Sequence, residues 1–152
     1  MNLYQKLDKA RELVRNTKHK KSGRNTYSNY DYFTPEQVEL IVAEVCQETK
    51  MLPLCSLKRN EHGIYQEMSL VNLEDTSETP LVFELATVQG ALKATNETQQ
   101  MGGTDTYSER YIKMKVFQIK DNNLDFDAHD NAKSVKKAAK DIYLPEDEDL
   151  EF

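Results

Sequence analysis

Apolar side chains recur every three or four residues in two early segments of the chain, which is the spacing of an amphipathic helix. The first segment predicts a helix over residues 2–16 with a basic polar face. The second predicts a helix over residues 35–49, because Thr34 is a hydroxyl N-cap and Pro35 suits the first helical position. The two apolar stripes consist of Leu3, Leu7, Ala10 and Val14 and of Val38, Ile41, Val42 and Val45.

Residues 52–59, 63–73 and 80–88 have the composition and spacing of strands. The middle segment alternates most regularly, and the Asn-Glu-His-Gly sequence of residues 60–63 predicts a hairpin turn before it. Polar residues 74–80 connect it to the third segment. Together the three segments predict a three-stranded antiparallel meander.

A third helix is expected over residues 104–118, after Gly102 and Gly103. The fold class is therefore α+β, with a three-stranded antiparallel sheet packed against two or three helices. We expect four parts along the chain, the last being a disordered acidic tail. These parts are a basic N-terminal helix and linker over 1–24, an α+β core over 25–130, a short helix over 131–143 and the tail over 144–152.

The 152 residues suit a single domain, and no apolar run approaches the ~20 residues needed to cross a bilayer. Cys46 and Cys55 lack metal-ligand spacing and predict packed thiols. His19 and His62 have no nucleophile nearby, so neither indicates acid–base catalysis. We therefore expect a cytoplasmic protein without a membrane contact, a cofactor, a metal site or an enzymatic activity.

The net charge of −6 conceals a strong asymmetry. Residues 1–24 hold eight Lys or Arg and two Asp or Glu, a net charge of +6, whereas residues 141–152 hold six acids and no base. Such a separation indicates charged partners at both ends. Residues 125–130 could bind a divalent ion through their carboxylates and an imidazole, but a solvated acidic turn is the stronger interpretation.

Two segments carry candidate DNA contacts. In the first, Gly102 and Gly103 could expose their backbone amides to phosphate at the N-terminus of the third helix. Hydroxyl groups and cationic side chains of the same segment would add further phosphate contacts. The alternative is a capped helix whose Tyr107 and Tyr111 pack on the sheet. The candidates of this segment are Gly102, Gly103, Thr104, Thr106, Arg110 and Lys113.

The second segment combines cations for the phosphates with aromatic rings for the bases, as single-stranded DNA binding requires. The alternative is a solvated linker followed by tyrosines anchored in the core. Its candidates are Lys18, Lys20, Lys21, Arg24, Tyr27, Tyr30 and Tyr32.

The pattern Gln-x-x-Gly-Gly-x-x-Thr-Tyr-x-x-Arg-Tyr over residues 99–111 resembles the ERF (essential recombination function) family, and the likeness extends over residues 3–130. A departure is Glu109, since the family often has two adjacent arginines before the final tyrosine. The resemblance implies a phage protein of the bacterial host cytoplasm that binds and anneals single-stranded DNA in recombination and replication. It also implies a homo-oligomer, a ring or filament.

The acidic tail resembles that of bacterial single-stranded DNA-binding proteins, which implies contacts with replication or recombination proteins. A solubilising tail that screens the basic N-terminal segment is the alternative. Two other functions stay open: a replicative protein that only protects single strands, and an adaptor that binds no DNA. The candidate partner-binding residues are Asp147, Glu148, Asp149, Leu150 and Phe152.

Overall fold

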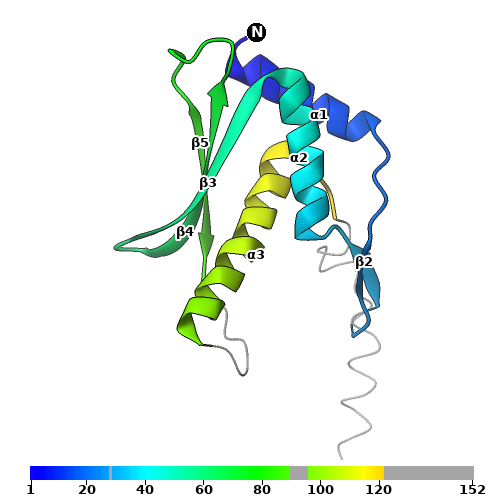
Figure 1. The fold of residues 1–152 in the computed structure, drawn as a ribbon, viewed down its shortest axis with the longest axis vertical. Coiled ribbons are helices and arrows are strands. Elements are labelled where there is room, and N and C mark those ends of the chain that lie inside the picture. The colour runs from blue at the N-terminus through cyan, green and yellow to red at the C-terminus, as the bar shows by residue number, and fades with distance from the viewer. Residues whose placement is uncertain (28, 90–95, 122–152) are drawn as a thin grey trace, which may run out of the picture. The chain divides into compact units, whose positions relative to one another are not determined.

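The computed structural model of the chain describes residues 1–27, 29–89 and 96–121, which belong to one compact unit. The unit has three helices, a three-stranded antiparallel sheet and a small two-stranded sheet (Figure 1). The expected α+β class is therefore confirmed. In chain order the elements are α1 (Leu3–Asn16), β1 (Gly23–Asn25), β2 (Tyr30–Tyr32), α2 (Pro35–Thr49), β3 (Met51–Asn60), β4 (Gly63–Asn72), β5 (Leu81–Thr87) and α3 (Glu97–Phe117).

Strands β3, β4 and β5 form the expected meander, with β4 in the centre. Met68 of β4 pairs with Cys55 of β3 and with Phe83 of β5, so these three side chains share the face that is directed to the core. The hairpin turn between β3 and β4 is where the sequence predicts it, and Gly63 adopts the positive φ of 131° that favours glycine.

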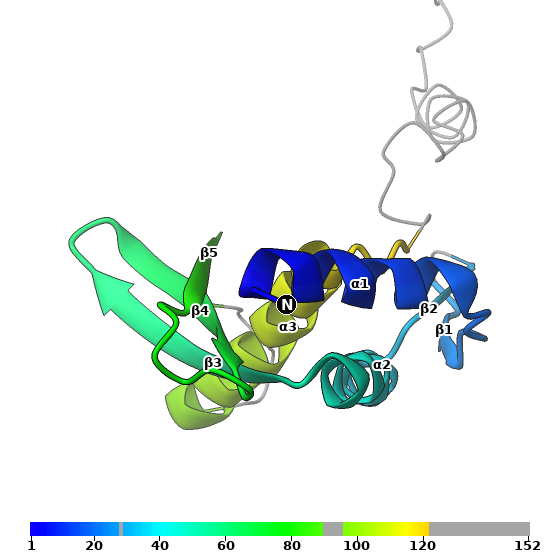
Figure 2. The same ribbon diagram turned by 90° about the horizontal axis from the view of Figure 1, so that it is seen from above.

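All three helices lie on one face of the sheet (Figures 1 and 2). Helix α3 packs directly on the strands, α2 packs on α3, and α1 contacts both of these helices. The apolar stripes predicted for α1 and α2 are buried, as expected. The opposite face of the sheet remains exposed and carries Leu52, Leu54 and Val82.

The N-termini of α1 and α2 have reciprocal capping boxes, in which the side chains of the N-cap and of a glutamine three residues later each accept a backbone hydrogen bond. Helix α3 begins at Glu97 in the same way, with Asn96 as N-cap and Gln99 as its partner. The expected start at Thr104 is wrong by two turns. The reason is that this capping box stabilises a start before the glycine pair.

Lys6 joins α1 to two other parts of the unit. Its side chain is fully buried, and its Nζ lies 2.7 Å from the Glu74 carboxylate and 3.3 Å from the carbonyl oxygen of Lys50. Glu78 in the same β4–β5 connection accepts a hydrogen bond from the Leu3 amide. The polar connection is thus held to the start of α1 by its carboxylates.

The expected short helix over 131–143 and the tail over 144–152 lie outside the described residues, so the division of the chain into four parts stays a prediction. Within the described part of the chain, we find no helix with both the length and the apolar character needed to span a bilayer.

Candidate nucleic-acid interface

Strands β1 and β2 pair as a short hairpin. The hairpin lies in the second candidate segment, which combines cations with aromatic rings. Gly23 lies opposite Tyr32, and a Cβ at Gly23 would come within 2.7 Å of the Tyr32 ring carbons. A side chain at this position would therefore have to displace the Tyr32 ring, which covers the Cα of Gly23. Strand pairing between Gly23–Asn25 and Tyr30–Tyr32 was not predicted.

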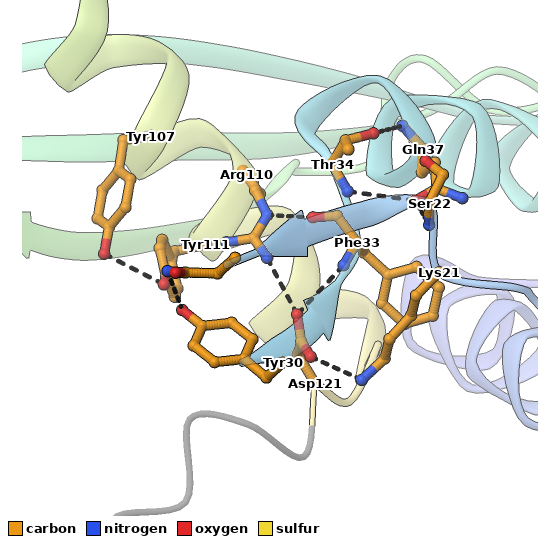
Figure 3. Close-up of polar contacts among 11 residues, drawn as sticks. Lys21, Ser22, Tyr30, Phe33, Thr34, Gln37, Tyr107, Arg110, Tyr111 and Asp121 are labelled. Carbon is orange, nitrogen blue, oxygen red and sulfur yellow. Dashed lines mark hydrogen bonds and ion pairs between the residues drawn. The ribbon is translucent and has the colours of Figure 1, made fainter. Parts of the chain in front are cut away.

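Side chains of other elements anchor the linker between α1 and β1. The Gln37 side chain donates to the carbonyl oxygen of Lys20 at 2.6 Å. It also accepts from the Ser22 amide at 2.9 Å (Figure 3). Lys21 forms an ion pair of 2.7 Å with Asp121 and lies 5.4 Å from the centre of the Phe33 ring. Side chains from α2 and from the end of α3 thus fix the path of the linker.

The Asp121 carboxylate joins three segments (Figure 3). Besides Lys21, it accepts from the Arg110 guanidinium at 3.1 Å and from the Phe33 amide at 3.2 Å. Its side chain is only 1% exposed, so two cations and an amide compensate its buried charge. This carboxylate connects the linker, the residue after β2 and helix α3.

Four tyrosines of the hairpin and α3 either contact Arg110 or pack on a ring that does, and we call them the tyrosine cluster: Tyr30, Tyr32, Tyr107 and Tyr111. The Arg110 Cζ lies 5.5 Å from the centre of the Tyr32 ring and 5.0 Å from that of Tyr111, within the range of cation–π contacts. Its Nε donates to the carbonyl oxygen of Phe33 at 2.6 Å. Arg110 therefore holds the rings of two separate elements together.

Tyr107 and Tyr111 are one helical turn apart on α3, with ring centres separated by 4.6 Å and hydroxyl groups 3.1 Å apart. Tyr107 is 60% exposed, and the rings lie beside the β1–β2 hairpin (Figure 3). The hydrogen bond to Tyr111, together with partial burial, raises the pKa of Tyr107 to about 12. The phenol is thus even further from ionisation at physiological pH than an ordinary tyrosine.

The glycine pair does not lie at a helix N-terminus, which corrects the proposed arrangement for phosphate binding. Gly102 and Gly103 are inside α3. The hydroxyl of Thr104 donates to the carbonyl oxygen of Gln100, and that of Thr106 donates to Gly102. Backbone amides in the interior of a helix already have partners, so they are not free for phosphate.

Lys113 is buried and forms ion pairs with Glu39 and Glu109. Burial lowers the pKa of its ammonium group, but hydrogen bonds to the two carboxylates outweigh this effect and raise the pKa. Arg110 is 8% exposed and paired as well. A direct DNA contact of either residue stays a prediction and would require these pairs to open.

Exposed cations lie on the linker and at the ends of α1 and α3. Lys18 and Lys20 are exposed, as are Arg15 and Lys120, and none of the four has an ion-pair partner among the described residues. Arg24, in contrast, pairs with Asp31 in the hairpin at 2.9 Å.

The predicted DNA contacts did not include Tyr107 and Tyr111, which were named only in the alternative in which they pack on the sheet. Buried Thr104, Ser108 and Ile112 occupy the face of α3 that is directed inward. These residues follow one another at intervals of four, and this spacing was the available signal that the tyrosines lie on another face. Tyr27, which was predicted, is 99% exposed and lies apart from the packed rings.

Both cysteines are free thiols, as expected. Burial raises the pKa of Cys46 to about 12 and that of Cys55 to about 11, so neither is a reactive thiolate at neutral pH. Among the residues that the structure describes, no group of three metal-ligating side chains is present. The acidic residues 125–130 lie outside them.

The sequence of the chain matches the family model of the ERF superfamily over residues 3–148. No curated protein and no solved structure matches the chain significantly. The match covers nearly the whole chain and extends beyond the segment that carries the resemblance. The chain therefore belongs to the ERF superfamily, whose role lies in phage recombination and single-strand annealing.

Proposed function

We propose that the protein binds single-stranded DNA across the tyrosine cluster and the neighbouring cations, and that it anneals complementary strands without enzymatic chemistry. The tyrosine cluster carries this proposal, because two of its rings contact the Arg110 guanidinium, the other two rings pack on these, and Tyr107 is exposed. Unpaired bases stack on such rings irrespective of their sequence, with about 1–3 kcal/mol per base. In duplex DNA the base faces are not accessible for this contact.

The exposed cations supply the second requirement, which is neutralisation of the phosphates. Lys18 and Lys20 lie on the anchored linker, beside the hairpin that holds Tyr30 and Tyr32. Their ammonium groups are free to replace counterions on a strand that leaves the tyrosine cluster. Binding of this kind weakens with salt, with a slope of about −0.7 per contacted phosphate for single strands.

Annealing requires that the Watson–Crick edges of bound bases stay accessible. Stacking on a tyrosine ring covers only the face of a base, so its edge remains available to a second strand. Family membership supports assembly of several copies along one strand, as a ring or filament. The acidic tail is the proposed contact for other replication or recombination proteins.

The test is the rate at which two complementary labelled oligonucleotides pair, measured by energy transfer with and without the protein. We expect acceleration at low salt and its loss when Tyr107 and Tyr111 are both changed to Ala. Strong binding without acceleration would instead indicate a protein that only protects single strands. No binding at low salt would leave the adaptor function.

A further inference from the structure

A pocket of about 340 Å³ lies where the C-terminal end of α1, the linker and the residues after α3 meet. Its volume is at the small end of the ~300–1,000 Å³ typical of ligand sites. Val14, Phe33 and Ile119, all buried, provide apolar walls. Arg15 and Lys120, both exposed, lie at its rim. The pocket thus combines an apolar interior with a cationic entrance.

His19 also lines this pocket, and its Nε2 is buried without a hydrogen-bond partner. A buried polar atom left unpaired costs about 1–3 kcal/mol, so each one requires an explanation. Gln66 Nε2 is another such atom, but that side chain is fully buried between the sheet and α3. His19 differs because the residue lines a pocket, so that a rotation of its imidazole would bring the unpaired nitrogen to a ligand there.

Charge distinguishes this pocket from a second one that His19 also lines. The second, of about 430 Å³, is bordered by Glu44 and Glu48 and would repel an anion. None of the described residues that line the first pocket is acidic. The nearby Asp121 is buried and already paired with Lys21 and Arg110. The first pocket therefore suits a ligand with a flat apolar body and negative charges beside it.

We infer that the pocket accepts one unpaired base of the bound strand, with its edge at His19 and its flanking phosphates at Arg15 and Lys120. This inference rests on the proposed function. The pocket adjoins the tyrosine cluster through Phe33, whose carbonyl oxygen accepts from Arg110, so one strand can reach both. A base within a duplex cannot enter without leaving its stack.

The imidazole makes this pocket tolerant of sequence. In neutral histidine one ring nitrogen donates and the other accepts, and a change of tautomer exchanges the two roles. Nε2 can therefore accept from an amino group of adenine or cytosine, or donate to a carbonyl oxygen of thymine or guanine. The pocket fits an annealing protein because it does not select one base.

The test compares His19→Ala with His62→Ala, since His62 is a matched histidine with an 84% exposed side chain in the β3–β4 turn. The probe is a single-stranded oligonucleotide with 2-aminopurine, whose fluorescence reports the surroundings of the base. We expect His19→Ala to weaken binding about threefold to tenfold, which is the loss of one hydrogen bond, and to abolish part of the fluorescence change. His62→Ala should behave as the unmodified protein does.

Lys120→Ala provides a second variant, because the Lys120 side chain is exposed and forms no ion pair among the described residues. It should reduce the slope of log affinity against log salt concentration by about 0.7, which corresponds to one phosphate contact. An oligonucleotide that lacks bases should not distinguish His19→Ala from the unmodified protein.

The inference is overturned if the unmodified protein binds DNA but neither variant changes affinity, fluorescence or salt slope. A water molecule would then account for the unpaired nitrogen. This result differs from failure of the proposed function, in which the unmodified protein binds no single strand at low salt.

Discussion

The carboxylate of Asp121 lies 3.1 Å from the guanidinium of Arg110, and both groups hydrogen-bond to the backbone of Phe33, the residue that follows the hairpin with Tyr30 and Tyr32. Arg110 in turn contacts the rings of Tyr32 and Tyr111. The tyrosine cluster therefore depends on a buried carboxylate, which holds Arg110 in place. The buried ion pair between Asp121 and Arg110 thus determines where these aromatic rings lie at the surface.

Asp121→Ala should lower the free energy of unfolding by about 3–5 kcal/mol, because it leaves buried Arg110 without its carboxylate. Urea denaturation measures this change. Glu12→Ala is the matched control, since Glu12 forms an exposed pair with Lys9 and its loss should change stability by under about 1 kcal/mol. Equal effects of the two variants would contradict a central role of Asp121.

Changing both Tyr107 and Tyr111 to Ala should weaken single-strand binding at least tenfold, since each stacked base contributes about 1–3 kcal/mol. Fluorescence anisotropy of a labelled oligonucleotide gives the affinity. Tyr4→Ala is the control, because Tyr4 is 72% exposed at the opposite end of α1 from the linker. A loss of affinity as large in Tyr4→Ala would show that the tyrosine cluster is not the site.

Gly102→Ala should stabilise the protein by about 0.5–1 kcal/mol, because Gly102 lies inside α3 and an added Cβ meets nothing within 4 Å. Thermal unfolding measures the gain. DNA affinity should not change. Reduced affinity without loss of stability would restore the glycine pair as a phosphate contact.

Stability should fall below about pH 4.5, in part through the β4–β5 connection. The hydrogen bond and the charge of Lys6 lower the pKa of Glu74 below its ordinary 4.5. Its contribution is therefore complete above the pKa of the unfolded chain and is lost as the pH falls through the lower value of the folded protein. Urea denaturation between pH 3 and 7 should show a smaller acid loss for Glu74→Gln than for the unmodified protein.

The local pattern of apolar residues was sufficient to predict α1, α2 and the three-stranded meander. Each of these elements buries a regular set of apolar side chains and has a clear cap or turn beside it. The same pattern failed for α3, where Asn96 and Gln99 begin the helix in a segment too polar to suggest one. The glycine pair then looked like a boundary although it lies within the helix. Capping chemistry determined the start more strongly than the helix propensity of glycine did.

The candidate interface was predictable only in part. The cations of the linker and the tyrosines of β2 are adjacent in sequence, and composition identified them. Asp121 contacts Lys21 and Phe33 across 100 and 88 residues, and no local pattern encodes such contacts. The same contacts occupy Lys21 and Arg110, which sequence reasoning had assigned to DNA.

The central claim is that the protein recognises unpaired bases, and the most direct measurement compares its affinity for a single strand and for a duplex of the same length at low salt. We predict tighter binding to the single strand, with a preference that decreases when Tyr107 and Tyr111 are both changed to Ala. Equal or tighter binding to the duplex, or no binding to either, would contradict the claim.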